Sequence, residues 1–183
     1  MIRTGGWLLA ALVLLALAAC TDSAAPQRDT RDTGVPELDV LIRDIEAGDR
    51  SALRARLQFV LLPCTHDLGA GGPPKCATEP EATPVDVFRY IACEPAWVRE
   101  ARVDPVLEEA LAHRFARFAA YRESGALVAV FAATDRPVVG AGIAVTLQGD
   151  RITALRRTCG AGDTARALLP PLGASYLLPP PPP

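Results

Sequence analysis

Residues 64–76 read Cys-Thr-His-Asp-Leu-Gly-Ala-Gly-Gly-Pro-Pro-Lys-Cys, and Cys93 closes the next strand-like run. Glycine and proline recur so often between residues 64 and 84 that no regular element can extend far through this stretch. The pattern predicts a long loop, and long loops in compact domains are either functional or disordered. Because a cysteine lies near each end, we expect an ordered loop around which the folded part of the chain is organised.

The first twenty residues have the layout of a secretory signal. Arg3 supplies a positive charge, and Trp7–Leu17 is an apolar run too short for a comfortable membrane span. The four residues Leu-Ala-Ala-Cys at 17–20 resemble the lipobox of bacterial lipoproteins. That resemblance implies cleavage before Cys20 and attachment of acyl chains such as palmitate to Cys20, which anchor the protein to a membrane. The alternatives are an ordinary signal peptide and an uncleaved anchor.

Composition divides the remainder into three parts. Residues 21–35 are small, polar or charged, and such a stretch cannot bury enough apolar surface to order itself. The end of the chain is rich in glycine, alanine and proline, and its five final prolines predict an extended or disordered segment. We expect a signal peptide at residues 1–19, a lipidated cysteine with a disordered tether at residues 20–35, a single α+β domain at residues 36–160 and a tail at residues 161–183.

An even number of cysteines remains for the folded part once Cys20 is set aside: Cys64, Cys76, Cys93 and Cys159. In an exported chain this number predicts disulfides. Three pairings are possible. We favour Cys64 with Cys76, which closes the loop, and Cys93 with Cys159, which ties the middle strand to the last.

Two other roles for these cysteines stay open. Cys64, His66, Cys76 and Cys93 are ligand types that zinc accepts, although their spacing matches none of the usual paired zinc motifs. Free thiols are the remaining possibility. We expect disulfides, no metal and no cofactor.

Helical patterns open the domain. Apolar residues recur at helical spacing from Leu38 to Ile45, after Pro36 and before Gly48, and predict an amphipathic helix. Asp49 is placed to cap a second, short helix. Asp104 and Pro105 then predict the start of another helix, running to about residue 113, with Asp104 as its cap.

Strand patterns follow. Residues 59–62 form a short apolar run that predicts a buried strand, and residues 85–93 alternate as a strand does. The final part predicts an antiparallel meander, because β-favouring runs alternate with turn signals, of which Gly149-Asp150 is the clearest. Its strands are expected at 115–123, 126–133, 142–148 and 151–158.

This order predicts an α+β fold with N-terminal helices packed on a curved antiparallel sheet that ends in a C-terminal meander. In this order a helix is followed by Gly-Asp, a short helix and a meander that contains Gly-Asp-Arg-Ile-Thr. Across about residues 37–158 this succession is similar to that of the nuclear-transport-factor-2-like, ketosteroid-isomerase-like class. That resemblance implies a cone-shaped pocket in which an Asp or Tyr acts, and Asp86, Tyr90 and Tyr121 are the residues that fit a possible pocket. No motif matches residue by residue, so no catalytic role is assigned. A cystatin-like sheet and a small β-barrel with added helices are the alternative architectures.

The charges, 19 basic against 21 acidic residues, give no support to a nucleic-acid partner. We expect a lipid-anchored protein of the cell envelope, on the outer side of the cytoplasmic membrane or in the periplasm or outer membrane. Its expected role is a binding or accessory domain for an unknown protein or small-molecule ligand. The alternative is a small extracytoplasmic isomerase or hydrolase with a pocket in the sheet.

Overall fold

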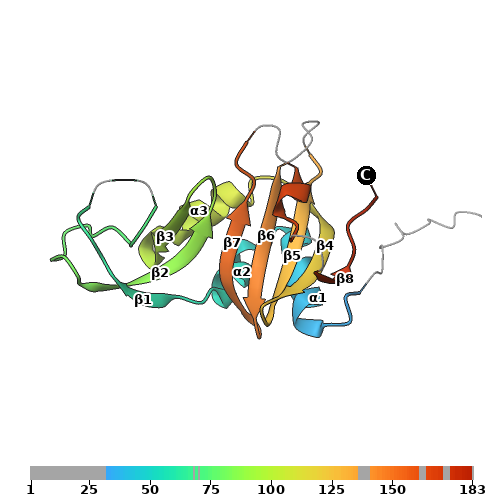
Figure 1. Ribbon diagram of the computed structural model, residues 1–183, viewed down its shortest axis with the longest axis horizontal. Helices are drawn as coiled ribbons and strands as arrows, with labels where there is room; N and C mark the ends of the chain where they lie inside the picture. Colours follow the sequence, from blue (N-terminus) through green and yellow to red (C-terminus); the bar gives the residue numbers. More distant parts are fainter. Residues whose placement is uncertain are drawn as a thin grey trace, which may run out of the picture. The chain divides into compact units, whose positions relative to one another are not determined.

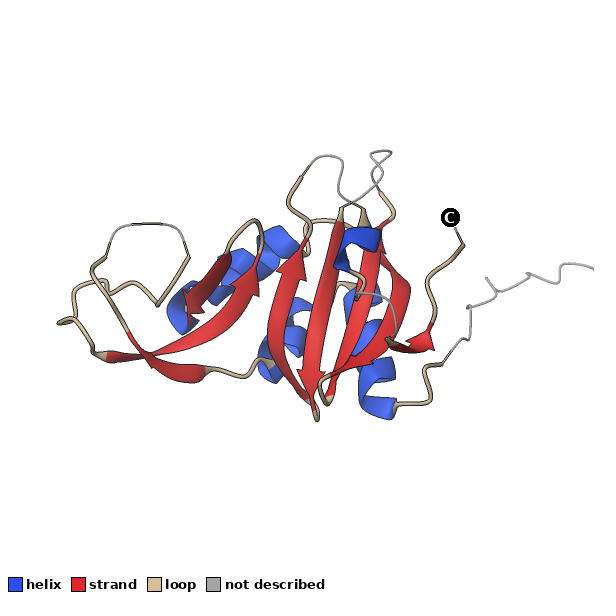
Figure 2. Ribbon diagram, in the orientation of Figure 1, coloured by secondary structure: helices blue, strands red, loops and turns tan. Residues whose placement is uncertain are grey.

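The computed structural model describes residues 32–67, 69, 71–135, 141–160, 164–170 and 174–182. The predictions for the signal peptide, for lipidation at Cys20 and for the tether up to residue 31 concern residues outside this part. The unit from Asp32 to Pro183 has a mixed α+β fold with one large, open sheet (Figures 1 and 2). Its helices are α1 (Pro36–Ala47), α2 (Arg50–Arg56) and α3 (Val103–Ala110), with 3-10 turns η1 (Glu100–Arg102) and η2 (Ala165–Leu168).

Eight strands make the sheet: β1 (Val60–Pro63), β2 (Pro84–Ile91), β3 (Pro95–Arg99), β4 (Phe115–Glu123), β5 (Ala126–Ala133), β6 (Gly142–Gln148), β7 (Arg151–Arg157) and β8 (Ser175–Leu178). Their order is β1-β2-β7-β6-β5-β4-β8. Strand β3 pairs with the edge of β2 that is opposite to the edge paired with β7. The strands from β4 to β7 form the predicted antiparallel meander. The sheet as a whole is mixed, because β2 and β7 run parallel, so the expectation of an all-antiparallel sheet is wrong at this junction.

The first two helices form as their sequence patterns predict. All four apolar residues at helical spacing in α1 are buried: Leu38, Leu41, Ile42 and Ile45. Gly48 ends the helix in the left-handed conformation with a φ of 67°, which glycine adopts without steric cost. Asp49 then accepts a hydrogen bond of 3.0 Å from the backbone N–H of Ala52 and caps α2.

Two local predictions need correction, and one strand was missed. Residues 60–63 do form a strand, but Leu61 is 65 % exposed rather than buried, because β1 pairs only with β2 among the described strands and lies at the sheet edge. Helix α3 begins at Val103, not after Asp104, since the 3-10 turn η1 leads directly into it, and it ends at Ala110. Strand β3 was not predicted.

A further difference concerns the segment after residue 160, which sequence analysis treated as a tail. Ser175–Leu178 pairs with β4 as strand β8, and the Leu178 side chain is buried in the main core. The 3-10 turn η2 lies over β5 and β6, where it buries Ala165 and Leu168. Part of this segment therefore belongs to the folded unit.

The two faces of the sheet are covered differently. On one face α1, α2 and α3 pack against the strands around a continuous apolar core that includes Phe88, Phe131 and Leu155. On the other face, which we call the open face, η2 covers a smaller cluster over β4, β5 and β6 (Figure 1). A Cβ at Gly142 would lie 2.8 Å from the Cα of Ala165, so only glycine lets η2 approach β6 this closely.

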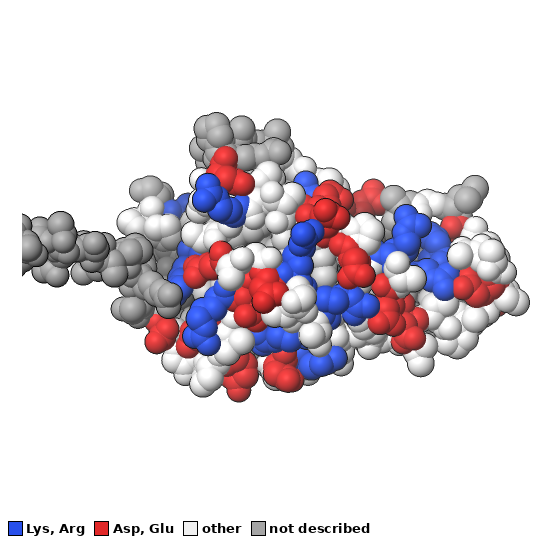
Figure 3. Space-filling model, turned by 180° about the vertical axis from the view of Figure 1, so that it is seen from behind, with Lys and Arg blue, Asp and Glu red and all other residues white. Residues whose placement is uncertain are grey.

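The helix-bearing side carries intermixed charges. Figure 3 shows acidic and basic side chains alternating over it without a patch of one sign. Several of them pair, as Arg54 does with Glu100 at 3.0 Å and with Asp104 at 3.2 Å. No helix in the described part of the chain is long and apolar enough to cross a membrane.

Candidate functional site

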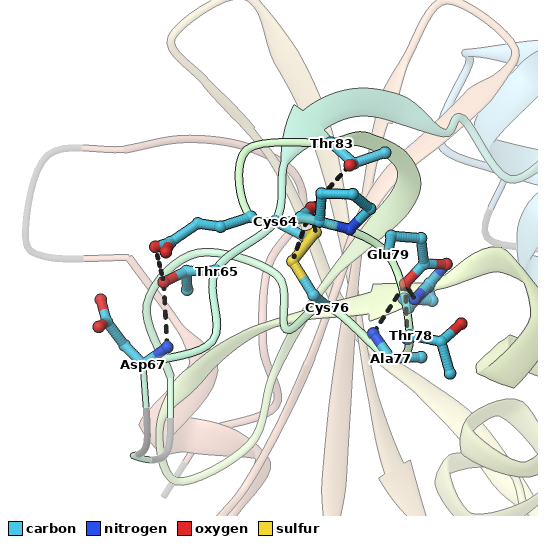
Figure 4. The surroundings of a disulfide bond; sticks show 11 residues. Cys64, Thr65, Asp67, Cys76, Ala77, Thr78, Glu79 and Thr83 are labelled. Carbon is cyan, nitrogen blue, oxygen red and sulfur yellow. Dashed lines mark hydrogen bonds and ion pairs between the residues drawn. A yellow bond between two sulfur atoms is a disulfide. The ribbon is translucent and has the colours of Figure 1, made fainter.

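The glycine- and proline-rich loop is ordered by a disulfide between Cys64 and Cys76, whose Cα atoms lie 5.0 Å apart (Figure 4). Cys64 also exchanges backbone hydrogen bonds with the far end of the loop, donating to the Thr83 carbonyl at 2.9 Å and accepting from Ala82 at 2.8 Å. The two cysteines pack on Val85 and Val87 of β2, on the open face. The loop is therefore fixed against the sheet at its base.

Glu79 adds a second attachment between this loop and the sheet. Its carboxylate accepts hydrogen bonds from both guanidinium nitrogens of Arg99 on β3, one of them 2.9 Å long. It also accepts from the backbone N–H groups of Ala77 at 2.8 Å and Thr78 at 3.1 Å. These bonds, first of all those from Arg99, hold the pKa of Glu79 well below its ordinary value of 4.5.

A second disulfide joins Cys93, just after β2, to Cys159, just after β7. These two strands pair over only a short register, from Arg89 opposite Ala154 to Ile91 opposite Arg156. The disulfide closes the end of that short parallel pair. Both bridges match the pairing favoured from sequence, and with these cysteines oxidised the zinc alternative has no thiolates to use.

The three candidate pocket residues do not converge on one site. Asp86 is exposed and lines a depression of about 540 Å³ beside Arg99 and Glu79. Tyr90 is half-buried against the helix-covered core, where burial raises the pKa of its hydroxyl despite a hydrogen bond with Arg157. Asp86 and Tyr90 thus lie in different environments, one in a surface depression and the other against the core, and they do not form a common site.

Tyr121 lies on the open face and is completely buried. Its hydroxyl donates to the backbone carbonyl of Leu168 in η2 at 3.2 Å and accepts from Nη2 of Arg156 at 2.8 Å. Burial raises the pKa of Tyr121, and the charge and hydrogen bond of Arg156 oppose that rise. The phenol is thus a neutral group that ties η2 and β7 to the centre of the open face.

A cleft of about 580 Å³ lies on the open face, beyond the part that η2 covers. Its size is that of a pocket for a small molecule. Its walls come from seven strands, β1 to β7, and the residues between them. Most of the lining residues are polar: Gln58, Val60, Arg89, Ile91, Trp97, Glu123, Ser124, Ala126, Thr146, Gln148, Thr153, Ala154 and Arg156.

Strand register places the functional groups of this cleft. Arg89 lies directly opposite Trp97 of β3, so the two side chains are neighbours on one face. On its other edge β2 meets β7, where Ala154 faces Arg89 and Arg156 faces Ile91. Because side chains alternate along a strand, Arg89 and Arg156 project diagonally from adjacent strands on the same face. An aromatic side chain and two cations therefore line one end of the cleft.

These two arginines have no carboxylate partner among the residues that the structure describes. Arg89 is exposed and makes no ion pair or hydrogen bond with any residue that the structure describes. The partner of Arg156 is the neutral Tyr121 hydroxyl. Arginines on other parts of the surface, in contrast, are held by carboxylates: Arg54, Arg56, Arg99, Arg117 and Arg157.

Sequence reasoning found Tyr121 but missed Arg89, Trp97 and Arg156. The alternation in β2 was visible, and it places Arg89 on the face opposite Phe88 and Tyr90. What the sequence did not contain was the pairing of β2 with β7, which brings Arg156 beside it. No known family model matches this chain, and no curated protein matches its sequence.

Proposed function

We propose that this protein is an extracytoplasmic lipoprotein, lipidated at Cys20, whose folded unit is a binding domain held on a membrane surface. The lipobox-like residues 17–20 and the polar stretch that follows support the anchor and the tether. Two disulfides in the folded unit fit an oxidising compartment outside the cytoplasm. Thr33 lies within the tether predicted for residues 20–35, and its hydroxyl donates to the Asp39 carboxylate of α1 at 2.8 Å, so this part of the segment is attached to the folded unit.

The observation that carries the binding function is the polar cleft on the open face, opposite a face filled by apolar packing. Arg89, Trp97 and Arg156 supply a small number of polar and aromatic groups in the lining of a cavity of ligand size. The guanidinium of Arg89, which has no partner among the described residues, has hydrogen-bond donors available for a ligand.

The alternative function, an isomerase or hydrolase, requires a pocket with reactive side chains. The helix-covered side of the sheet is packed with apolar groups, and the residues lining the open-face cleft include no histidine or cysteine. Tyr121 adjoins the cleft through Arg156 but is itself fully buried. These features favour binding over catalysis, and we assign no catalytic residue.

We also propose that the domain is related to the nuclear-transport-factor-2-like class. The support is the succession of α1, Gly48-Asp49, α2 and a meander with its turn at Gly149-Asp150. The cleft proposed here is not the cone-shaped pocket that this resemblance implied, because it lies on the face away from the helices.

The anchor is tested by fractionation and by mass spectrometry of the mature N-terminus. We expect the wild-type chain to begin at an acylated Cys20 and to sediment with membranes. A Cys20→Ala variant should lose the acyl chains and leave the membrane fraction. A Cys20→Ala chain that is still processed and remains membrane-bound would contradict the proposal.

The binding function is tested by thermal shift of the full chain in detergent against a panel of sugars, amino acids, carboxylates and phosphate esters. A Thr146→Phe variant, which fills the cleft from β6, is the matched control. We expect at least one compound class to raise the melting temperature of the wild type and not of Thr146→Phe. No shift with any compound, or an equal shift in both proteins, would refute binding in this cleft.

A further inference from the structure

An arginine without a carboxylate partner indicates the class of ligand. Arg89 is exposed, lines the open-face cleft and makes no ion pair or hydrogen bond with a described residue. Arg156 also lines the cleft, but its guanidinium extends away from β2, toward the Tyr121 hydroxyl of β4. Guanidinium groups bind carboxylates and phosphates with paired hydrogen bonds, so an oxyanion is the group that fits them best.

Trp97 adds an apolar requirement beside these charges. It is half-buried, directly opposite Arg89, and also packs against the cluster that includes the Cys64–Cys76 disulfide. These contacts hold the indole in place where it lines the cleft. Rings and short apolar groups pack well against an indole.

Glu123 and Ser124 also line the cleft, where β4 turns into β5. The negative charge of Glu123 acts on the Tyr121 hydroxyl, to which Arg156 donates a hydrogen bond. Arg89, in contrast, has no carboxylate partner among the described residues, so it is the cation of the cleft that is available to an anionic ligand.

We propose that the cleft binds a small organic oxyanion, a carboxylate or phosphate monoester, whose charged group pairs with Arg89 and whose ring or apolar part lies against Trp97. This inference rests on the proposed binding function and gives it a ligand class. Arg89 and Trp97 lie directly opposite each other on the paired strands β2 and β3, which places the charged and the aromatic group side by side.

Trp97 makes the test specific to the cleft. The chain has two tryptophans, Trp7 and Trp97. In a Trp7→Phe protein purified in detergent, all tryptophan emission comes from Trp97, whether or not the residues before Cys20 have been removed. Phenyl phosphate and phenylacetate are the anionic probes, 2-phenylethanol is the neutral probe, and inorganic phosphate tests the anion without the ring.

We expect a saturable change in Trp97 emission with at least one anionic probe, and weaker effects with inorganic phosphate and with 2-phenylethanol. Arg89→Gln should weaken that binding roughly tenfold, the usual effect of losing a hydrogen bond to a charged group. Arg156→Gln, which removes a guanidinium that already donates to Tyr121, should weaken it less. Arg43→Gln, which removes an exposed arginine of α1 far from the cleft lining, should leave the affinity unchanged. Circular dichroism of each variant verifies that it is folded.

Two results would overturn the inference. If 2-phenylethanol binds as tightly as the anions and the arginine variants bind normally, the cleft takes a neutral ligand, and the proposed binding function survives without its anion. If no probe changes Trp97 emission at millimolar concentration, this ligand class is wrong. The proposed binding function is then decided separately, by the thermal shifts of the wild type and of Thr146→Phe. A preference between phenyl phosphate and phenylacetate identifies which oxyanion the site recognises.

Discussion

Arg156 of β7 donates a hydrogen bond of 2.8 Å to the hydroxyl of Tyr121 on β4, with β5 and β6 lying between these strands. Both side chains must lie flat along the open face to meet. The same hydroxyl donates to Leu168 of η2 at 3.2 Å, so one phenol connects β4, β7 and the 3-10 turn. This contact also sets the boundary between the covered part of the open face and the cleft.

Replacing Tyr121 with phenylalanine should lower the free energy of unfolding by about 1–2 kcal/mol, because a buried carbonyl and a guanidinium lose their partner. Urea denaturation measures the change. Tyr176→Phe is the matched control, since Tyr176 is 37 % exposed, packs edge-on against Tyr121 and makes no hydrogen bond through its hydroxyl with the described residues. Equal stability of the wild type and Tyr121→Phe would show that the buried hydrogen bonds contribute nothing net.

Two leucines at opposite extremes of exposure test the location of the core. Leu41 of α1 is 0 % exposed and Leu61 of β1 is 65 % exposed. Leu41→Ala should cost about 2–5 kcal/mol, because it leaves a cavity between α1 and the sheet. Leu61→Ala should change stability by less than about 0.5 kcal/mol. A comparable loss in both variants, measured by denaturant unfolding, would mean that β1 is buried in solution.

The two disulfides should differ in their contribution to stability. Cys64 and Cys76 are separated by 12 residues and Cys93 and Cys159 by 66. On the chain-entropy model the first closure contributes roughly 3 kcal/mol and the second roughly 4 kcal/mol. We expect the paired serine variant of Cys93 and Cys159 to unfold at the lower denaturant concentration. The reverse order would indicate that the packing of the Cys64–Cys76 disulfide on β2 contributes more to stability than the difference in loop-closure entropy.

The Glu79–Arg99 pair should make stability depend on pH in the acid range. Because the pKa of Glu79 is lower in the folded protein than its ordinary value of 4.5, the interaction is fully present above about pH 4.5. It is lost progressively as the pH falls below that value and Glu79 is protonated. The melting temperature of the wild type should therefore fall more steeply below pH 4.5 than that of Glu79→Gln.

Glu94→Gln is the control for this pH series. Glu94 is exposed and makes no ion pair with a residue in the described ranges. Its variant should follow the wild-type pH profile. If the melting temperatures of the wild type and Glu79→Gln fall in parallel with pH, the interaction of Glu79 with Arg99 does not contribute to acid sensitivity.

Local patterns in the sequence determined the elements whose contacts are near in the chain. The helix α1, the cap at Asp49 and the strands β4 to β7 follow from residues a few positions apart, because helical hydrogen bonds and tight hairpins join close neighbours. The cysteine count and the export-type leader likewise favoured the disulfide pairing that the structure contains.

Tertiary structure alone decided the elements whose environment depends on distant residues. The apolar composition of Val60–Pro63 predicted burial, but exposure depends on which strands flank it, and β1 has only β2. Strand β8 likewise needed the free edge of β4, more than fifty positions earlier in the chain. Neither partner can be identified from composition.

The candidate site shows the same division. Alternation within β2 assigns Arg89 to one face, and alternation within β7 assigns Arg156 to one face. Whether these are the same face, and whether the two strands touch, depends on a parallel pairing formed across the intervening chain of β3, α3, β4, β5 and β6. The sequence by itself determined the two disulfides and the meander. Only the tertiary structure brought Arg89, Arg156 and Trp97 into the lining of one cleft, because strand pairing over long separations is set by packing and not by local pattern.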